Sequence, residues 1–161
     1  MMGAVMDARK LASVRIRWMI RRDMAKVLGI EAECFRHPWT EADFVRCLRQ
    51  RNCIGMVADY EDQAVGFMIY ELHKSRIHLL NFAVAENHRR RGVGRQMVAK
   101  LVAKLSPNRR SRIVLDVSEY NLDAQLFFRA LGFRATEVLH APYPNASGDA
   151  YRFEMNADER R

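Results

Sequence analysis

The 161-residue chain is 49 % apolar and 29 % charged, which is the composition of one ordinary globular domain and excludes a disordered protein. Its 27 basic and 19 acidic residues give a net charge of +8, so anionic partners are favoured, whether a phosphorylated cofactor, an acidic peptide or RNA. No run approaches the roughly 18 apolar residues of a membrane span. Three cysteines without CxxC spacing and five histidines without HxxxH spacing predict neither a disulfide framework nor a bound metal.

Hydrophobic periodicity then divides the chain into strands and helices. Alternation at Val14, Ile16 and Trp18 predicts a half-buried first strand, Asp23 is placed to cap the first helix, and Thr40 begins an imperfect capping box. The expected order is strand 13–20, helix 23–35, a helix from Thr40, strands 53–60, 64–72 and 76–84, a helix ending near 105, strand 112–117, helix 122–131, and strands 134–140 and 150–155. This order predicts an α/β (α+β) fold, a mixed sheet with helices on both faces.

The stretch 79–105 carries the clearest chemical signal. A strand ending at Val84 leads through the basic turn Arg89-Arg90-Arg91-Gly92-Val93-Gly94 into an amphipathic helix. The first backbone N–H groups of a helix lack intrahelical partners and lie at the positive end of its dipole, and glycine lets an anion approach them. The context therefore predicts an anion site, whereas the string alone is equally compatible with a solvated turn.

Two motifs resemble the GCN5-related (GNAT) N-acetyltransferases. NFAVAENHRRRGVG matches the acetyl-CoA motif Q/R-x-x-G-x-G/A of that family through Arg89, Gly92 and Gly94, and LFFRALGF (126–133) is similar to its aromatic-helix-L-G-F ending. The resemblance covers nearly the whole chain from Ser13. It implies a mostly antiparallel sheet of about seven strands in one domain, 13–157, between flexible extensions at 1–12 and 158–161.

Shorter motifs resemble the ribosomal-protein alanine N-acetyltransferases (RimI-type) and archaeal protein N-terminal acetyltransferases. His37-Pro38-Trp39-Thr40 is similar to their F-P-W-S, and Leu115-Asp116-Val117 to their L-E-V. Pro142-Tyr143-Pro144 with Gly148-Asp149-Ala150 resembles their Y-Y-P…D-G-x-x-D-A loop. The resemblance implies acetyl-CoA as co-substrate and a protein N-terminus as acceptor, with a ribosomal protein among the candidates.

The resemblance also implies where acetyl-CoA binds. The backbone of Phe82, Ala83 and Val84 would pair with the pantetheine arm, and Asn121 would contact the same arm. The alternative for residues 82–84 is that they form only a core strand. The alternative for Asn121 is that it only caps a helix. The pyrophosphate would lie on the amides of the following turn, which comprises Arg89, Arg90, Arg91, Gly92, Val93, Gly94 and Arg95.

Acetyl transfer needs a neutral amine, an oxyanion donor and a proton for the leaving thiolate. A peptide α-amine has a pKa near 8 and a lysine one near 10.4, so a weak or water-relayed base suffices for the α-amine. The family's glutamate base corresponds to Asp116, which is one methylene shorter and would act directly or through water. The alternative for Asp116 is a solvated carboxylate, and the oxyanion donor would be a strand amide such as that of Val84.

The sequence departs from the family at Phe128, which stands where the family has its tyrosine acid. Phenylalanine has no proton to give, so Phe128 is expected to pack within the cofactor site. The proton would then come from water or from Tyr143, which could instead bind the peptide or fill a gap. Tyr120 and Glu119 are weaker candidates.

Three other functions remain open at this stage. The chain could acetylate a small-molecule amine, because acceptor specificity lies in variable loops. It could bind acetyl-CoA with reduced catalysis because of Phe128. Basic segments could contact RNA, but no RNA-reading aromatic motif is present, so direct nucleic-acid binding is not expected. Neither a membrane nor a metal is expected, and the cytoplasm is the expected compartment.

Overall fold

The computed structural model describes residues 10–143 and 148–159. Most of the predicted N-terminal extension, Pro144 of the predicted loop motif and the last two residues of the predicted tail lie outside these ranges. The main elements are β1 (Arg15–Trp18), α2 (Met24–Cys34), α3 (Glu41–Leu48), β2 (Cys53–Tyr60), β3 (Gln63–Leu72), β4 (Arg76–Val84), α4 (Val93–Val102), β5 (Arg112–Ser118), α5 (Leu122–Ala130), β6 (Arg134–Leu139) and β7 (Ala150–Asn156).

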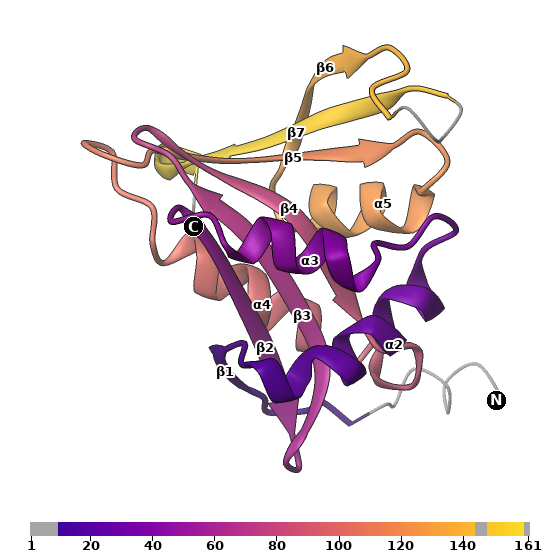
Figure 1. Ribbon diagram of the computed structural model, residues 1–161. Coiled ribbons are helices and arrows are strands. Elements are labelled where there is room, and N and C mark those ends of the chain that lie inside the picture. Colours follow the sequence, from indigo (N-terminus) through magenta and orange to yellow (C-terminus); the bar gives the residue numbers. More distant parts are fainter. Residues whose placement is uncertain (1–9, 144–147, 160–161) are drawn as a thin grey trace, which may run out of the picture.

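The seven strands form one sheet in the order β1-β2-β3-β4-β5-β7-β6 (Figure 1). Every neighbouring pair is antiparallel except β4 and β5, which run parallel. Helices α2 and α3 cover β2, β3 and β4 on one face, and α4 and α5 lie on the other. The predicted mixed, mostly antiparallel sheet with helices on both faces is therefore confirmed.

Apolar side chains fill both layers between helices and sheet. Val27 and Ile30 of α2 pack with Phe44 of α3 and Phe67 of β3, while Met97 of α4 belongs to a larger cluster on the opposite face. Among the described residues, no helix has the length and apolar character needed to cross a membrane.

Local signals in the sequence predicted two of the helix starts. The Thr40 hydroxyl accepts the N–H of Asp43 at 3.2 Å, and the Asp43 carboxylate accepts the N–H of Thr40 at 2.9 Å, which completes the capping box of α3. Asn121 Oδ1 accepts the Ala124 N–H at 3.2 Å and caps α5. Both caps leave the helix start without an unsatisfied donor at that position.

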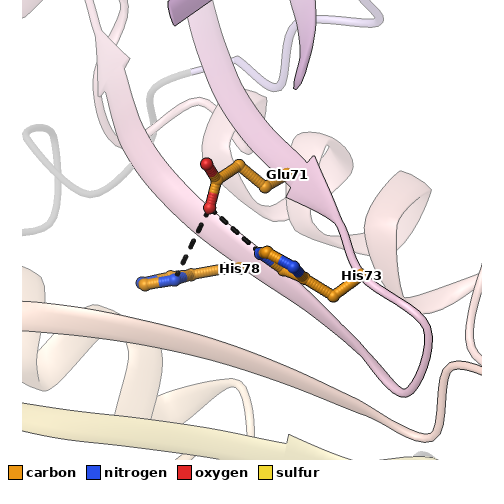
Figure 2. A group of neighbouring side chains, drawn as sticks. All are labelled: Glu71, His73 and His78. Atoms are coloured by element: carbon orange, nitrogen blue, oxygen red, sulfur yellow. Dashed lines mark hydrogen bonds and ion pairs between the residues drawn. The ribbon is translucent and has the colours of Figure 1, made fainter. Parts of the chain in front are cut away.

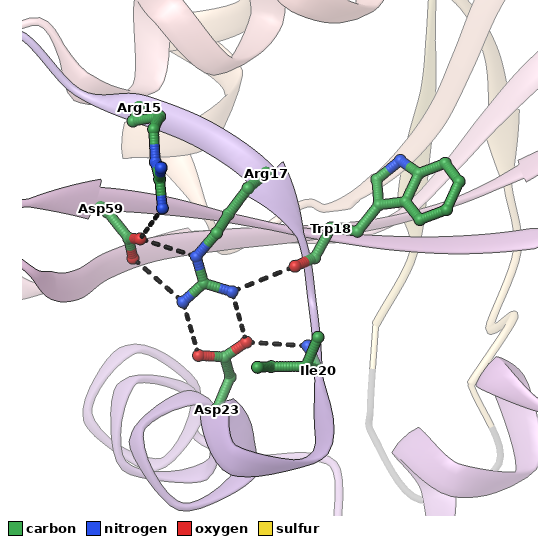
Figure 3. A network of polar contacts seen from close by, with 6 residues as sticks. All are labelled: Arg15, Arg17, Trp18, Ile20, Asp23 and Asp59. Atoms are coloured by element: carbon green, nitrogen blue, oxygen red, sulfur yellow. Dashed lines mark hydrogen bonds and ion pairs between the residues drawn. The ribbon is translucent and has the colours of Figure 1, made fainter.

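Asp23 is the N-cap residue of α2, as predicted, but its side chain makes no capping hydrogen bond. Its carboxylate instead accepts two hydrogen bonds from Arg17, each 2.8 Å long, and one from the Ile20 N–H (Figure 3). Arg17 also donates to Asp59 of β2 at 2.6 Å, so one guanidinium ties the edge strand to the start of α2. Trp18, expected on the buried face, is 73 % exposed because β1 ends there at the sheet edge.

The chain before β1 also contacts the domain. The N–H of Ala12 donates to the Arg91 carbonyl at 2.9 Å, and Arg91 Nε donates to the Lys10 carbonyl at 2.9 Å. Ala12 is buried. Residues 10–12 therefore pack against the basic turn, although the sequence analysis assigned them to the extension.

The feature that positions the site is a split between β4 and β5. The two strands pair only from Arg76 opposite Arg112 to Leu79 opposite Leu115, and they separate beyond that point. In the same place Ile69 of β3 faces Asn81 while Tyr70 faces Leu79, so Leu80 is an extra residue that bulges β4. The last residues of β4 consequently have β3 on one side and an open edge on the other.

Candidate active site

The open edge of β4 presents the backbone of two of the three predicted pantetheine residues. The Ala85 N–H donates to the Val65 carbonyl of β3 at 2.8 Å, and backbone direction alternates along a strand. Ala83 therefore faces β3, whereas Phe82 and Val84 direct their backbone groups toward the split. An extended ligand can add to such an edge as another strand would.

Buried hydrogen bonds hold this edge of β4 against α2. Asn81 Nδ2 donates to Glu31 Oε1 at 2.8 Å, and Asn81 Oδ1 accepts the N–H of Phe82 at 2.9 Å. The other Glu31 oxygen accepts the Trp39 N–H at 2.8 Å. Glu31 is only 2 % exposed, and burial raises the pKa of its carboxyl. One side chain of α2 thus fixes both β4 and the connector to α3.

The basic turn forms the expected start of α4. Arg90 and Gly92 adopt the left-handed conformation, with φ of 61° and 80°, and α4 begins at Val93. The N–H groups of Val93, Gly94 and Arg95 have no intrahelical acceptor, because the helix offers none to its first turn. The turn can therefore present backbone donors to a pyrophosphate.

Two arginine side chains of the turn support its shape. Arg89 donates to the Val84 carbonyl at 3.2 Å and to Cys34 Sγ at 3.0 Å. Arg91 donates to Tyr60 Oη at 3.1 Å, and its guanidinium lies 4.7 Å from the centre of the Tyr60 ring. The donors available to an anion at this turn are consequently the backbone amides together with the remaining arginines.

Phe128 lies in an aromatic cluster beneath the open edge. Its ring is 3 % exposed and lies 5.5 Å from Phe82, 5.0 Å from Phe127 and 5.3 Å from Phe133, measured between ring centroids. Gly94 makes room for this cluster, since an added Cβ would lie 2.9 Å from Phe127. These contacts give Phe128 a packing role, and its place beside a cofactor stays a prediction.

Asp116 follows Leu115, the last residue of β5 that pairs with β4, and it pairs with Arg152 of β7 on the other side. Both of its oxygens accept from Arg152 of β7, at 2.9 and 3.3 Å. Burial, and to a smaller extent the charge of Asp116, raise the pKa of the Tyr143 phenol. The two residues predicted to be catalytic therefore lie close enough to interact electrostatically.

His78 is a third titratable group at this place, and sequence reasoning missed it. Its Nε2 lies 3.8 Å from Asp116 Oδ2, and its Nδ1 lies 4.0 Å from Glu71 Oε1. His73 Nε2 is hydrogen-bonded to the same Glu71 oxygen at 3.1 Å, so one carboxylate stands between two imidazoles (Figure 2). Burial lowers the pKa of His78, against the opposite effect of Asp116 and Glu71.

Glu71, His73 and His78 are also the one group of described residues whose ligand-type atoms gather closely, within 4.8 Å of one another. Those atoms already pair among themselves through the hydrogen bond and the ion-pair contact. The His73–Glu71 contact is a hydrogen bond, whereas the His78 nitrogens lie 4.0 Å from Glu71 and 3.8 Å from Asp116, beyond hydrogen-bond distance.

A pocket of about 180 Å³ lies on β4, β5, β6 and β7, and one of its lining residues, Arg152, is the partner of Asp116. It is lined by Arg76, Arg112, Val114, Glu137, Arg152 and Glu154. The lining alternates in charge, and an Arg112–Glu154 contact of 3.2 Å closes one side.

Comparison with known proteins agrees with this geometry. Residues 24–133 match the family described as "Acetyltransferase (GNAT) family". The [Ribosomal protein bS18]-alanine N-acetyltransferase of Salmonella typhimurium is 26 % identical over 78 % of this chain and 84 % of its own length. The N-alpha-acetyltransferase of Sulfurisphaera tokodaii is 23 % identical over 90 % of this chain and 94 % of its own.

Solved structures give the same result. Ard1 from Thermoplasma volcanium superposes with a TM-score of 0.79 at 25 % identity, covering 89 % of this chain and 97 % of that one. The ribosomal-protein-S18-alanine N-acetyltransferase from Escherichia coli also reaches 0.79, at 22 % identity, and covers 90 % and 94 %, which supports the fold. Since the family match spans more than half of the sequence, the chain belongs to the GNAT family and is an acetyl-CoA-dependent N-acetyltransferase.

Proposed function

We propose that the protein acetylates the N-terminal α-amine of a protein, with a ribosomal protein among the candidate acceptors. The similarity to enzymes named for acetylating protein N-termini supports this choice. The observation that carries it is the position of Asp116, whose carboxylate is held by Arg152 just beyond the last β5 residue that pairs with β4, beside the open edge of β4.

The cofactor would lie along the open edge of β4. The Phe82 carbonyl and the Val84 N–H are the groups that would pair with pantetheine, because the Phe82 N–H already donates to Asn81 Oδ1 and the Val84 carbonyl already accepts from Arg89. Ala83 lies between them and faces β3. The pyrophosphate would rest on the first-turn amides of α4, and Asn121 would reach the arm from α5. Because the pyrophosphate end is at the turn, the thioester end points back along β4 toward the split.

At the split, the acceptor amine would meet the thioester beside Asp116. The Asp116 carboxylate, held by Arg152, attracts and orients the amine. Tyr143 is proposed to donate the proton that the leaving thiolate needs, because its phenol is protonated at neutral pH and lies near Asp116. A peptide α-amine needs no strong base to become neutral, since its pKa lies near 8 and a fraction of it is already neutral at pH 7.

A panel of amines tests this proposal. Short peptides with free N-termini, the same peptides with blocked N-termini and one internal lysine, polyamines and aminoglycosides are each incubated with acetyl-CoA, and release of the CoA thiol is followed. We expect turnover of the free-N-terminus peptides alone. Turnover confined to lysine side chains or small amines, or acetyl-CoA binding without any turnover, would contradict the proposal.

A further inference from the structure

We propose that Glu71, His73 and His78 bind one Zn²⁺ ion beside the β3–β4 turn, and that the bound ion slows acetyl transfer. This departs from the expectation, drawn from the spacing of the histidines in the sequence, that no metal binds. Zinc binding does not depend on the proposed function. The effect on acetyl transfer does, because it assumes that Asp116 attracts the acceptor amine.

The first argument is the chemistry of the three donors. Two imidazoles and one carboxylate form a ligand set that Zn²⁺ takes in proteins, and three such ligands leave a fourth position for water. Among the described residues, this is the one group whose ligand-type atoms, one from each residue, all lie within 4.8 Å of one another. Mg²⁺ and Ca²⁺ prefer oxygen ligands throughout. The set therefore favours Zn²⁺ over both.

The second argument is the geometry of the donors. Bonds of about 2.0–2.1 Å to Zn²⁺ place the ligand atoms of a tetrahedral site about 3.3 Å apart. His73 Nε2 lies 3.1 Å from Glu71 Oε1, and His78 Nδ1 lies 4.0 Å from the same oxygen. Both imidazoles thus direct a nitrogen toward one carboxylate (Figure 2). Rotation of the side chains, without movement of the strands, is enough to bring all three atoms to one ion.

The third argument is that the hairpin holds the ligands in place. Glu71 and His78 lie opposite each other in the antiparallel pair of β3 and β4, so their side chains share a face. The His73 N–H donates to the Arg76 carbonyl at 2.9 Å, and Arg110 Nε donates to the His73 carbonyl at 2.9 Å. The three ligand side chains are 20 to 32 % exposed, so an ion can reach them from solvent.

The fourth argument concerns the second ring nitrogen of His78. A metal-binding histidine almost always donates its other N–H to a carboxylate, a backbone carbonyl or water, which orients the ring. When Nδ1 of His78 binds the ion, Nε2 carries the proton and faces Asp116 Oδ2, which lies 3.8 Å away. Asp116 is itself fixed by two hydrogen bonds from Arg152. Asp116 therefore acts as a positioning residue for this metal site.

The ion would act on acetyl transfer through Asp116. The carboxylate proposed to attract the acceptor amine would instead hold the His78 N–H, and a dication would lie one imidazole away from it. Both changes weaken the attraction between Asp116 and a cationic amine. Zn²⁺ and the amine should consequently oppose each other, so bound zinc raises the KM for the amine.

Equilibrium dialysis tests the site directly. Untagged full-length protein, freed of metal with EDTA, is dialysed against ZnCl₂, and the bound zinc is measured in the wild type, Glu71→Gln, His73→Gln and Asp116→Asn. We expect one ion per chain in the wild type and none with MgCl₂. Loss of an outer-shell partner costs about 10–100-fold in metal affinity, so Asp116→Asn should weaken binding by that factor and loss of a ligand by about 100-fold or more.

Two control variants locate the ion. His140→Gln removes an exposed histidine whose Nδ1 lies 3.4 Å from Asp149 Oδ2. Cys47→Ser removes one of two thiols whose sulfur atoms lie 3.0 Å apart, an alternative pair of zinc ligands. Both variants should bind zinc as the wild type does. Loss of zinc in Cys47→Ser with retention in His73→Gln would overturn the proposal, as would a wild type that binds zinc no more tightly than His73→Gln.

The acetylation rate tests the effect of the ion. The acetylated product is measured by mass spectrometry, because the CoA thiol itself binds zinc, and the amine is the one that the wild type acetylates best. At zinc ten times above its measured Kd, the KM for the amine should rise about tenfold relative to EDTA in the wild type and stay unchanged by zinc in His73→Gln. Thermal melts verify that each variant folds.

The outcomes separate this proposal from the proposed function. Zinc bound in dialysis without a change in the KM would overturn the effect on acetyl transfer. A wild type that fails on peptides but acetylates a small amine would defeat the proposed acceptor, and the zinc measurements would still decide the metal site.

Discussion

Gly94 of α4 packs against the Phe127 ring of α5. Its Cα faces the Phe127 ring, and a methyl group there would lie 2.9 Å from the ring edge, inside an aromatic cluster that cannot yield freely. Gly94→Ala should therefore destabilise the protein by about 1–2 kcal/mol in urea unfolding, after the better helix propensity of alanine is included. It should also weaken acetyl-CoA binding, because the first turn of α4 must shift.

Gly29→Ala is the matched control for this prediction. Gly29 lies in α2, and an added Cβ there meets nothing within 4 Å. Alanine should stabilise that helix by about 0.5–1 kcal/mol. If Gly94→Ala were as stable as Gly29→Ala and bound acetyl-CoA equally well, the prediction that the site requires close packing between Gly94 and Phe127 would be wrong.

Single residues differ in how well the sequence reveals their roles. Thr40 and Asn121 act as the caps that were predicted, because a cap is a local interaction with the chain three residues on. Asp23 has the same sequence signal for a side-chain cap as Thr40 and Asn121, but its carboxylate binds Arg17, which is six residues away in a strand. His78 escaped notice for a similar reason, since nothing near it in the sequence marks it as a partner of Asp116.

At the scale of elements, one polar network holds β1 and α2 to the sheet. Arg17 pairs with Asp23 and Asp59, whose side chains are 7 % and 12 % exposed (Figure 3). Arg17→Ala would leave two poorly solvated carboxylates without their cation, so we expect a loss of about 3 kcal/mol in the free energy of unfolding. Arg15 is the control: it is 78 % exposed and 3.7 Å from Asp59, so Arg15→Ala should change stability little.

The same network predicts a pH dependence. Arg17 lowers the pKa of Asp23 from its ordinary 3.8, so the folded state binds that proton more weakly than the unfolded state. The stabilisation is complete above the ordinary value and is lost as the pH falls through the lowered one. Urea unfolding from pH 7 down to pH 2 should show this loss in the wild type and a smaller one in Arg17→Ala. Parallel curves for the two proteins would argue against the assignment.

The order and type of elements were predictable because each follows from a local pattern of apolar residues. The register between the strands was not predictable from such local patterns. The parallel pairing of β4 with β5 and the Leu80 bulge decide which residues meet at the split. The first joins segments more than thirty residues apart in sequence, and the second depends on the register between β3 and β4, so no local apolar pattern reveals either. The turn of the acetyl-CoA motif was predictable, whereas the environment of Asp116 required the structure.

For the whole molecule, the residues proposed to bind the cofactor and those proposed to bind the acceptor lie on different sides of the split between β4 and β5. The cofactor elements are the edge of β4 and the start of α4, and the proposed acceptor residues are Asp116 and Tyr143. The net charge of +8 favours an anionic cofactor and an RNA-associated acceptor alike. Charge therefore supports the proposed acceptor class without selecting a member of it.

One measurement tests the central claim directly. A peptide with a free N-terminal alanine and one internal lysine is incubated with the protein and acetyl-CoA, and tandem mass spectrometry locates the acetyl group. We predict a single acetyl group on the α-amine, because the neutral α-amine is far more abundant at pH 7 than neutral lysine. Acetylation of the lysine Nζ with the α-amine untouched would contradict it.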